Sequence, residues 1–379
     1  MEVNHMSRKP EIVMVAEASE AHPRNGGADM IELNDGTIFM SRMEAVRATG
    51  LRHSADDEAP HDLVSMISRD GGRTWTDRRI MVARGPEDHS MYAPGLVRLR
   101  NGEILFRYEV YHRHAYGDLM SVSAYACISR DECRTFATPT SLWSRAEGQA
   151  GSQGDLRQLH SGRIIVPMLR LSDYHLQDDD KDHCRTGCFF SDDNGSTWKE
   201  GGFVDLPMRG TMEGKIEELK DGRLLMVMRT QLGSVFQSIS HDGGVIWSKP
   251  QTTWLIAPES CPGLTRIPQT SDLLIIWNHS LYDPGFDHCG LRSPLSVAIS
   301  KNDGQTWEKI KDIETDPEWE FTNPTALVTR NGDILIAYEA SKYESSSGPG
   351  HGNTRQTGRV GRDRMHLKLA IVDLEWLYE

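Results

Sequence analysis

The chain has 379 residues and carries 55 aspartates and glutamates against 42 lysines and arginines, so its formal net charge at pH 7 is −13. This acidic balance argues against nucleic acid or an anionic membrane surface as a partner. No apolar run reaches the length of a membrane span, and the first residues lack the apolar region of a signal peptide. We therefore expect a cytoplasmic protein, or an exported one if a signal peptide was removed.

Along the chain, six turn signals, each followed by a short apolar run, recur at intervals of roughly 50 to 66 residues. They are Asn34-Asp35-Gly36, Asn101-Gly102, Ser161-Gly162, Asp221-Gly222, Ser271-Asp272 and Asn331-Gly332. Each reads as the turn of a β-hairpin, and a repeat of this length is typical of propellers and solenoids. Since no single repeat could bury both faces of its own sheet, the repeats must pack as one unit.

A second motif, Ser-x-Asp-x-Gly-x-Thr-Trp, alternates with these hairpins and is called the Asp box below. Its five copies span residues 68–75, 129–136, 191–198, 240–247 and 300–307. In the second copy Cys133 replaces the glycine and Phe136 the tryptophan. The aspartate can accept backbone N–H groups within a turn, the glycine supplies a positive φ, and the tryptophan can pack between neighbouring sheets. The box therefore predicts architecture and not activity.

These patterns predict an all-β fold, a six-bladed β-propeller with Asp boxes, formed by residues 1–379 as a single domain. In the first repeat, strands are predicted at residues 29–33, 37–43, 63–68 and 79–83. The last repeat supplies only three strands, so residues 12–16 are expected to pair with it and close the ring. Residues 345–364 are predicted to form a long loop, and the last seven residues to lie against the outside.

The hairpin from Thr211 to Arg229 opens with a lone glutamate, Glu213, and closes with Arg229 after an apolar second strand. In a ring of such hairpins, the starts of the first strands and the ends of the second strands crowd one mouth of the central opening. The residues at these places are Arg24, Asn25, Arg42, Met91, Tyr92, Glu109, Gly154, Asp155, Arg170, Glu213, Arg229, Glu259, Ser260, His279, Thr322, Asn323 and Glu339. Their charges predict a site for a charged, polyhydroxylated ligand. The alternative is that Glu213 and Arg229 form a structural ion pair.

With its Asp boxes, six hairpins and the Glu213–Arg229 pair, nearly the whole chain resembles the sialidase (neuraminidase) superfamily of propellers with bacterial neuraminidase repeats. The resemblance implies that three arginines hold the carboxylate of a sugar through charge-assisted hydrogen bonds. Arg229 matches the second of these arginines and Arg292 the third. The family's Arg-Ile-Pro strand is replaced here by HPRNGGADMIEL, in which Arg24 is the candidate for the first, and Glu339 matches the glutamate that braces it.

The resemblance also implies an acid/base aspartate in the loop before the first Asp box, which here covers residues 52–62. Asp57 fits this role best, Asp56 is the second choice, and Arg52 would contact a sugar hydroxyl. The alternative is that this loop is a solvated acidic segment without a catalytic role. Glu213 matches the family glutamate that works with a tyrosine nucleophile.

The tyrosine itself is missing, because its place reads EFTNPTAL, with Asn323 at or beside the expected position. Tyr92, Tyr116 or Tyr343 could instead reach in from another part of the ring. Alternatively, Glu213 could act directly as base or nucleophile while Asp57 protonates the leaving oxygen.

The first functional hypothesis is an exo-acting glycoside hydrolase that releases a terminal acidic sugar, sialic acid or a relative, from a glycan. Its catalytic residues would be Asp57, Glu213 and Asp56. Its substrate-binding residues would be Arg24, Arg52, Arg229, Arg292, Glu339, Asn323, Tyr92 and Asp155. The partner is then a carbohydrate, and the oligomeric state is left open.

Two alternatives stay open at this stage. A related propeller could hydrolyse or eliminate another terminal sugar, such as rhamnose or a uronate, with a histidine as base. The histidines considered for that role are His112, His114, His160 and His279. A non-catalytic glycan-binding module would keep the arginines and need no paired carboxylates. Cys184 and Cys188 have a spacing compatible with metal binding, but no second pair completes a four-ligand set, so no metal or cofactor is expected.

Overall fold

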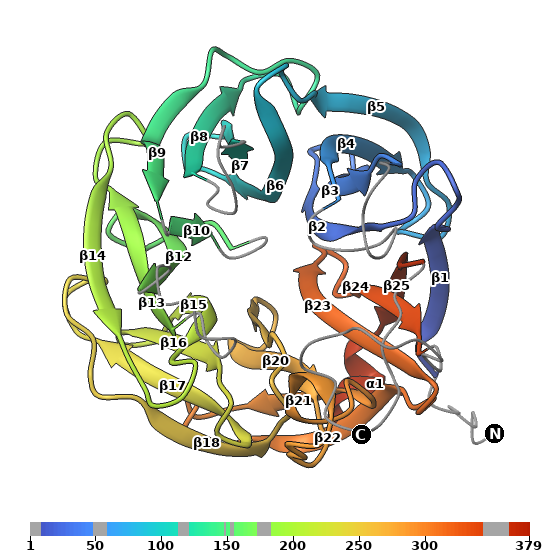
Figure 1. Ribbon diagram of the computed structural model, residues 1–379, viewed down its shortest axis with the longest axis vertical. Helices are drawn as coiled ribbons and strands as arrows, with labels where there is room; N and C mark the ends of the chain where they lie inside the picture. The colour runs from blue at the N-terminus through green and yellow to red at the C-terminus, as the bar shows by residue number, and fades with distance from the viewer. Residues whose placement is uncertain are drawn as a thin grey trace.

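Figure 1 shows the structure, a computed structural model, as six small β-sheets arranged in a ring around a central opening. The structure describes residues 9–47, 59–112, 121–147, 149–151, 155–172, 183–343 and 364–379. The predicted all-β class and six-bladed propeller are confirmed. Residues 345–363 of the predicted long loop lie outside the described residues, as do Arg52, Asp56 and Asp57.

The six sheets are called blades 1 to 6 in chain order. Blade 1 contains β2 (Asn25–Glu32), β3 (Ile38–Ala45), β4 (His61–Ser68) and β5 (Thr76–Val82). Blade 2 contains β6 (Asp88–Arg98), β7 (Ile104–His112), β8 (Ser121–Ser129) and β9 (Thr140–Glu147). Blade 3 contains β10 (Gln149–Gly151), β11 (Arg157–Gln158), β12 (Ile164–Ser172), β13 (His183–Ser191) and β14 (Lys199–Val204).

The second half of the chain continues this order. Blade 4 contains β15 (Met212–Glu218), β16 (Leu224–Arg229), β17 (Ser234–Ser240) and β18 (Gln251–Ile256). Blade 5 contains β19 (Gly263–Ile267), β20 (Asp272–Asn278), β21 (Leu295–Ser300) and β22 (Glu308–Glu314). Blade 6 contains β23 (Trp319–Val328), β24 (Ile334–Lys342), β25 (His366–Val372) and β1 (Glu11–Ala16).

The N-terminal strand β1 closes the ring. It pairs antiparallel with β25, with Ile12 opposite Ala370, and so becomes the outermost strand of blade 6. A backbone hydrogen bond of 2.9 Å from the N–H of Asn25 to the carbonyl of Met365 also joins blade 1 to blade 6. The prediction that residues 12–16 complete the last blade is confirmed, and β25 is no longer an open sheet edge.

Blade 3 departs from the expected four strands. Its first strand is divided into β10 and β11, which pair with opposite ends of the long strand β12.

The Asp boxes form the predicted turn clamps. In the first box, Asp70 accepts hydrogen bonds from the backbone N–H and the hydroxyl of Thr74, at 2.9 and 2.7 Å. The Ser68 hydroxyl donates to Asp70 and accepts the N–H of Gly72. These bonds, those from Thr74 first, lower the pKa of Asp70 to about 2. The aspartate is therefore ionised at neutral pH and locks the turn between the third and fourth strands.

The hydrophobic core lies between neighbouring blades, and each interface contains one aromatic side chain at an equivalent place. Five of these side chains end the Asp boxes: Trp75, Phe136, Trp198, Trp247 and Trp307. Blade 6 has no Asp box, and Trp376 of the C-terminal helix α1 (Leu374–Tyr378) packs between blades 5 and 6 instead. The C-terminal helix lies against β22, the outer strand of blade 5, as predicted, and it also buries Trp376 and Leu377. No helix among the described residues is long and apolar enough to cross a lipid bilayer.

Candidate functional site

Four blades carry the same irregularity in their first strand. Gly27, Ala93, Glu213 and Asn323 all have a positive φ, between 48° and 52°, and each lies nine residues before the glycine of its hairpin turn. The pairing register with the second strand shifts at each of these places, as in a β-bulge. A bulge redirects a side chain out of the regular alternation, and non-glycine residues with positive φ concentrate at functional sites. Two of the predicted site residues, Glu213 and Asn323, occupy such bulges.

Arg229 lies between two carboxylates. Its Nη1 donates to Oε2 of Glu213 at 2.9 Å, and its Nη2 donates to Oε1 of Glu259 at 2.8 Å. Glu259 also accepts from Gln231 at 2.7 Å and forms an ion pair with Arg209. The guanidinium of Arg229 is largely buried, which alone would lower its pKa, but the two carboxylates outweigh this effect and raise the pKa above its ordinary value. The predicted Glu213–Arg229 pair is thus one part of a larger ionic cluster.

Glu213 is ionised in this cluster. Burial alone would raise its pKa, but Arg229, Arg292 and Lys215 outweigh that effect and leave the pKa below the ordinary glutamate value. Its side chain retains an exposed fraction of 27%, whereas that of Glu259 is 2% exposed. Glu213 is therefore the carboxylate of the cluster that a ligand can reach. A carboxylate in this state can act as a base or nucleophile, but not as a proton donor.

Arg24 and Glu339 form a second buried pair, between blades 1 and 6. Nη2 of Arg24 donates to Oε2 of Glu339 at 3.1 Å. Oε1 of the same carboxylate accepts the backbone N–H of Gly27 at 2.9 Å and the side-chain amide of Asn323 at 3.1 Å. Gly26 makes room for this arrangement, because a Cβ there would lie 2.3 Å from Cδ of Glu339. The structure thus brings Arg24, Glu339 and Asn323 together.

Arg292 lies beside the first cluster. Its Nη2 donates to the carbonyl of Glu259 at 3.1 Å, and Nη1 lies 3.9 Å from Oε2 of Glu320. The backbone N–H of Arg292 donates to the hydroxyl of Tyr343 at 3.0 Å. Of the three tyrosines considered as replacement nucleophiles, Tyr343 is therefore in contact with one of the predicted arginines.

The remaining predicted residues have different surroundings. Asp155 is buried and forms an ion pair with Lys215, two residues after Glu213 on β15. Tyr92 packs against the rings of His61 and Tyr111 in blades 1 and 2. Arg52, Asp56 and Asp57 lie outside the described residues, as do Tyr116 and His114, so their predicted roles stay predictions.

Arg170 was expected at the mouth of the ring and His160 was considered as a catalytic base, but the structure places both elsewhere. Arg170 pairs with Glu200 of the outer strand β14 at 2.7 Å, so its side chain extends away from the axis. His160 lies in a hairpin turn, at the opposite ends of the strands from Glu213, where its ring contacts Glu218 at 2.8 Å. In both cases the partner is a carboxylate on a more distant strand, β14 for Arg170 and β15 of blade 4 for His160, which the repeat pattern does not indicate.

Four charged or titratable residues of the cluster were not predicted: Arg209, Lys215, His288 and Glu320. Lys215 had a sequence signal, because it follows the bulge residue Glu213 by two positions within the same strand. Arg209 and His288 lie in connections between strands, and Glu320 lies at the start of β23. No sequence motif marks these three residues. Among the described residues, no group of three or more histidines, cysteines, aspartates and glutamates could hold a metal ion.

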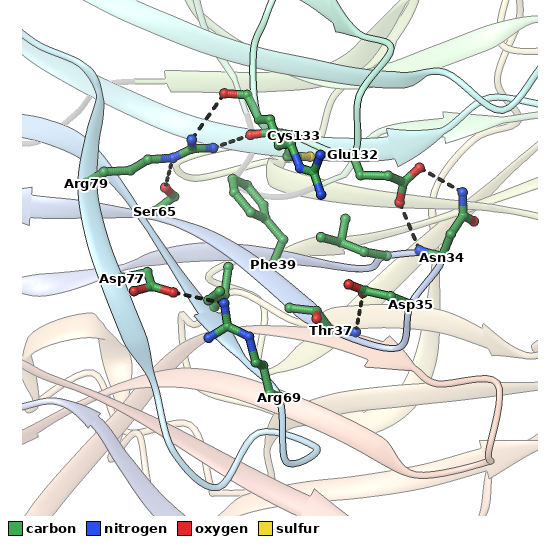
Figure 2. Close-up of a pocket in the computed structure, with 13 residues that line it drawn as sticks. Asn34, Asp35, Thr37, Phe39, Ser65, Arg69, Asp77, Arg79, Glu132 and Cys133 are labelled. Atoms are coloured by element: carbon green, nitrogen blue, oxygen red, sulfur yellow. Dashed lines mark hydrogen bonds and ion pairs between the residues drawn. The ribbon is translucent and has the colours of Figure 1, made fainter.

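A separate cleft of about 420 Å³ opens between blades 1 and 2 (Figure 2). Leu33, Phe39 and Ile67 line it together with charged residues that pair with one another, as Arg69 does with Asp77 at 3.1 Å. None of the predicted site residues lines it. The cleft therefore is not the site that the sequence predicts.

Comparison with known proteins agrees with this architecture. The family described as BNR repeat-like domain matches residues 48–336. The sialidase of Micromonospora viridifaciens is 26% identical over 334 residues, which cover 77% of this chain but only 46% of that protein. The chain therefore spans less than half the length of this relative.

Solved structures share the fold. The NanB sialidase of Streptococcus pneumoniae superposes with a TM-score of 0.70 at 13% identity, covering 98% of this chain and 71% of that one. The α-L-arabinanase of Penicillium chrysogenum superposes with a TM-score of 0.61 at 14% identity, covering 98% and 99%. The same ring of blades thus serves enzymes that act on different sugars. By its repeats, its fold and the match over residues 48–336, the chain belongs to the BNR repeat-like domain family of the sialidase superfamily.

Proposed function

We propose that the protein is an exo-acting glycoside hydrolase that releases a terminal acidic sugar, sialic acid or a relative, from a glycan. The observation that carries the proposal is the position of Glu213, an ionised carboxylate on a β-bulge that Arg229 holds in place. Arg292, which lies beside Glu259, and Arg24, which pairs with Glu339 between blades 1 and 6, would bind the carboxylate of the sugar through charge-assisted hydrogen bonds. The similarity to the Micromonospora sialidase supports the same class of reaction.

The proposed chemistry uses two carboxyl groups with different tasks. Because Glu213 is ionised, it attacks the anomeric carbon itself or removes a proton from the attacking group. Asp57, in the loop before the first Asp box, protonates the leaving oxygen. Asn323, at the place where the sialidase resemblance implies a tyrosine, has no ionisable group and instead holds Glu339. Tyr343 offers a second route, in which its phenol attacks with Glu213 as the base.

A second candidate function is suggested by the charge balance of the cluster. Arg229 already pairs with Glu213 and Glu259, and Arg292 lies near Glu320, so part of the positive charge that would attract a sugar carboxylate is neutralised. A hydrolase acting on a neutral terminal sugar, such as rhamnose, fits this balance. The structural similarity to an arabinanase supports this alternative at the level of the fold.

A panel of fluorogenic glycosides tests these proposals directly. The panel contains the 4-methylumbelliferyl glycosides of sialic acid, rhamnose, arabinose and glucuronic acid. Release from the sialoside is the expected result, and release from one of the others alone would favour the second candidate. Turnover of none of them, together with binding of the free sugars in calorimetry, would show a glycan-binding module and overturn both enzymatic proposals.

A further inference from the structure

Arg209 lies in the connection between β14 and β15, and this connection is tied to β13 of blade 3. The N–H of Cys184 donates to the carbonyl of Arg209 at 2.9 Å, and the N–H of Thr211 donates to the carbonyl of Cys184 at 3.0 Å. Gly210 permits this close approach, because a Cβ there would lie 2.0 Å from the carbonyl oxygen of Cys184. The hydroxyl of Thr211 also donates to the carbonyl of Val204 at 2.8 Å. The backbone that carries Arg209 is therefore anchored to blade 3.

The side chain of Arg209 joins the ionic cluster through Glu259. Its Nη1 donates to Oε1 of Glu259, the same oxygen that accepts a hydrogen bond from Nη2 of Arg229 at 2.8 Å. One carboxylate oxygen thus holds two guanidinium groups next to each other. Glu259 keeps its position because its other oxygen accepts the side-chain amide of Gln231 at 2.7 Å.

The two arginines differ in what they can still donate to a ligand. Nη1 and Nη2 of Arg229 donate to Glu213 and Glu259, and its Nε is buried. The Arg229 side chain is 11% exposed, whereas that of Arg209 is 28% exposed. A guanidinium group carries five N–H donors. Within the part of the chain that the structure describes, the Arg209 side chain donates to Glu259 alone. Arg209 is therefore the member of this pair that has N–H groups left for a ligand.

We propose that Arg209 is a further substrate-binding residue, whose guanidinium donates to the carboxylate of the terminal acidic sugar while Arg229 holds Glu213. The inference rests on the proposed function, because it names a residue that would recognise the charge of that substrate. A guanidinium binds a carboxylate through charge-assisted hydrogen bonds, often two in parallel. Two adjacent guanidinium groups repel each other, and the buried carboxylate of Glu259 between them offsets this repulsion.

Two substitutions and one control test this role. Arg209→Gln removes the charge, and its melting temperature is expected to stay close to that of the wild type because Glu259 retains two other partners. Arg209→Lys keeps the charge and the pairing with Glu259, but it presents a single ammonium group in place of the planar guanidinium. Arg223→Gln is the matched control, since Arg223 also pairs with a carboxylate, that of Asp221, and lies in the hairpin turn of the same blade.

Calorimetry compares two ligands that differ in charge, N-acetylneuraminic acid and its methyl ester. The wild type is expected to bind the acid about tenfold more tightly than the ester, because the ester has no charged group for Arg209. Arg209→Gln should lose about tenfold in affinity for the acid and less than about threefold for the ester, Arg209→Lys about threefold for the acid, and Arg223→Gln nothing for either. Equal losses for both ligands in Arg209→Gln would show a structural role and overturn the proposal. A wild type that binds the acid no better than the ester would also overturn it.

Kinetics on the fluorogenic sialoside separate this inference from the proposed function. Arg209→Gln is expected to raise KM about tenfold and to change kcat by less than about threefold, because the lost contact is present both in the bound substrate and in the transition state. A lowered kcat with an unchanged KM would overturn the proposal. If the wild type binds the acid but hydrolyses no glycoside, the proposed function fails, and the affinities for acid and ester still decide whether Arg209 recognises the carboxylate.

Discussion

The guanidinium of Arg229 donates to the carboxylate of Glu213 at 2.9 Å, across the open end of one hairpin. The two residues are 16 positions apart in sequence and lie at the start and end of two paired strands. A bulge at Glu213 turns its side chain out of the regular strand alternation. The hairpin turn therefore brings the two residues close together, and the bulge sets the direction of the Glu213 side chain.

Removing Arg229 should destabilise the protein, because two carboxylates would then lie together without their shared cation. Arg229→Met is expected to lower the free energy of unfolding by about 3 kcal/mol. Arg223→Met is the control, since Arg223 lies in the turn of the same hairpin and forms a more exposed pair with Asp221. That substitution should change the free energy by less than about 1 kcal/mol. Urea unfolding measures both values, and equal losses would contradict the assigned role of Arg229.

Gly26→Ala should displace the carboxylate of Glu339 from Arg24. The added Cβ would lie 2.3 Å from Cδ of Glu339, which is fully buried and has no space to retreat. We expect a loss of about 2 kcal/mol in the free energy of unfolding, as for other overpacked cores. Gly95→Ala is the control in blade 2, because its nearest neighbour would be a side-chain atom at 3.4 Å. Similar melting temperatures for the two variants would argue against a tight fit around Glu339.

Trp376 should contribute to stability as the Asp-box tryptophans do. Trp376 and Trp247 have the same exposed fraction, 8%, and each packs between two blades. Replacement of either tryptophan by alanine is expected to cost about 3 to 5 kcal/mol, because each leaves a cavity in an interface. Chemical unfolding measures both losses. A negligible cost for Trp376→Ala would show that the C-terminal helix is not part of the ring.

The titration of Asp29 should lower the free energy of unfolding as the pH rises. Burial raises its pKa from 3.8 to about 7, although the N–H of Leu96 and the charge of Arg157 oppose this effect. Between these two values the unfolded chain has lost the proton while the folded protein retains it. The contribution of Asp29 is therefore complete below about pH 4 and declines by up to about 1.4 kcal/mol per pH unit until about pH 7.

The variant Asp29→Asn isolates this effect, because an amide does not titrate. The free energy of unfolding of both proteins is measured in urea at pH 5 and pH 8. The value for the wild type minus the value for the variant should be larger at pH 5 than at pH 8. A difference that is independent of pH would mean that Asp29 is ionised in the folded protein.

Local sequence chemistry was sufficient to predict the blades. The Asp-Gly and Asn-Gly turns fix the hairpins, and the spacing of the Asp boxes fixes how many sheets must pack together. Closure by residues 12–16 followed from the need to cover an open edge. The role of Trp376 was not predicted, because a helix that replaces an Asp box shares no motif with it.

Several residues that the structure brings together were predicted because they lie at a repeated place in the hairpin, as Glu213, Arg229, Asn323 and Glu339 do. Arg292 was predicted from the sialidase resemblance instead. His288 was not, since it reaches Arg229 from the connection between β20 and β21, which no repeated motif marks. Partners of this kind depend on how blades are placed in the ring, and a single sequence does not specify that placement.

The central claim is that the ionised carboxylate of Glu213 performs the chemistry. The most direct test is to measure kcat on the hydrolysed glycoside for the variants Glu213→Gln and Glu218→Gln. Both residues belong to β15, but Glu218 lies at the end away from Arg229 and contacts His160. We predict that Glu213→Gln lowers kcat by about a thousandfold or more while the protein stays folded, and that Glu218→Gln changes kcat by less than about threefold. A folded Glu213→Gln variant with the kcat of the wild type would contradict the account.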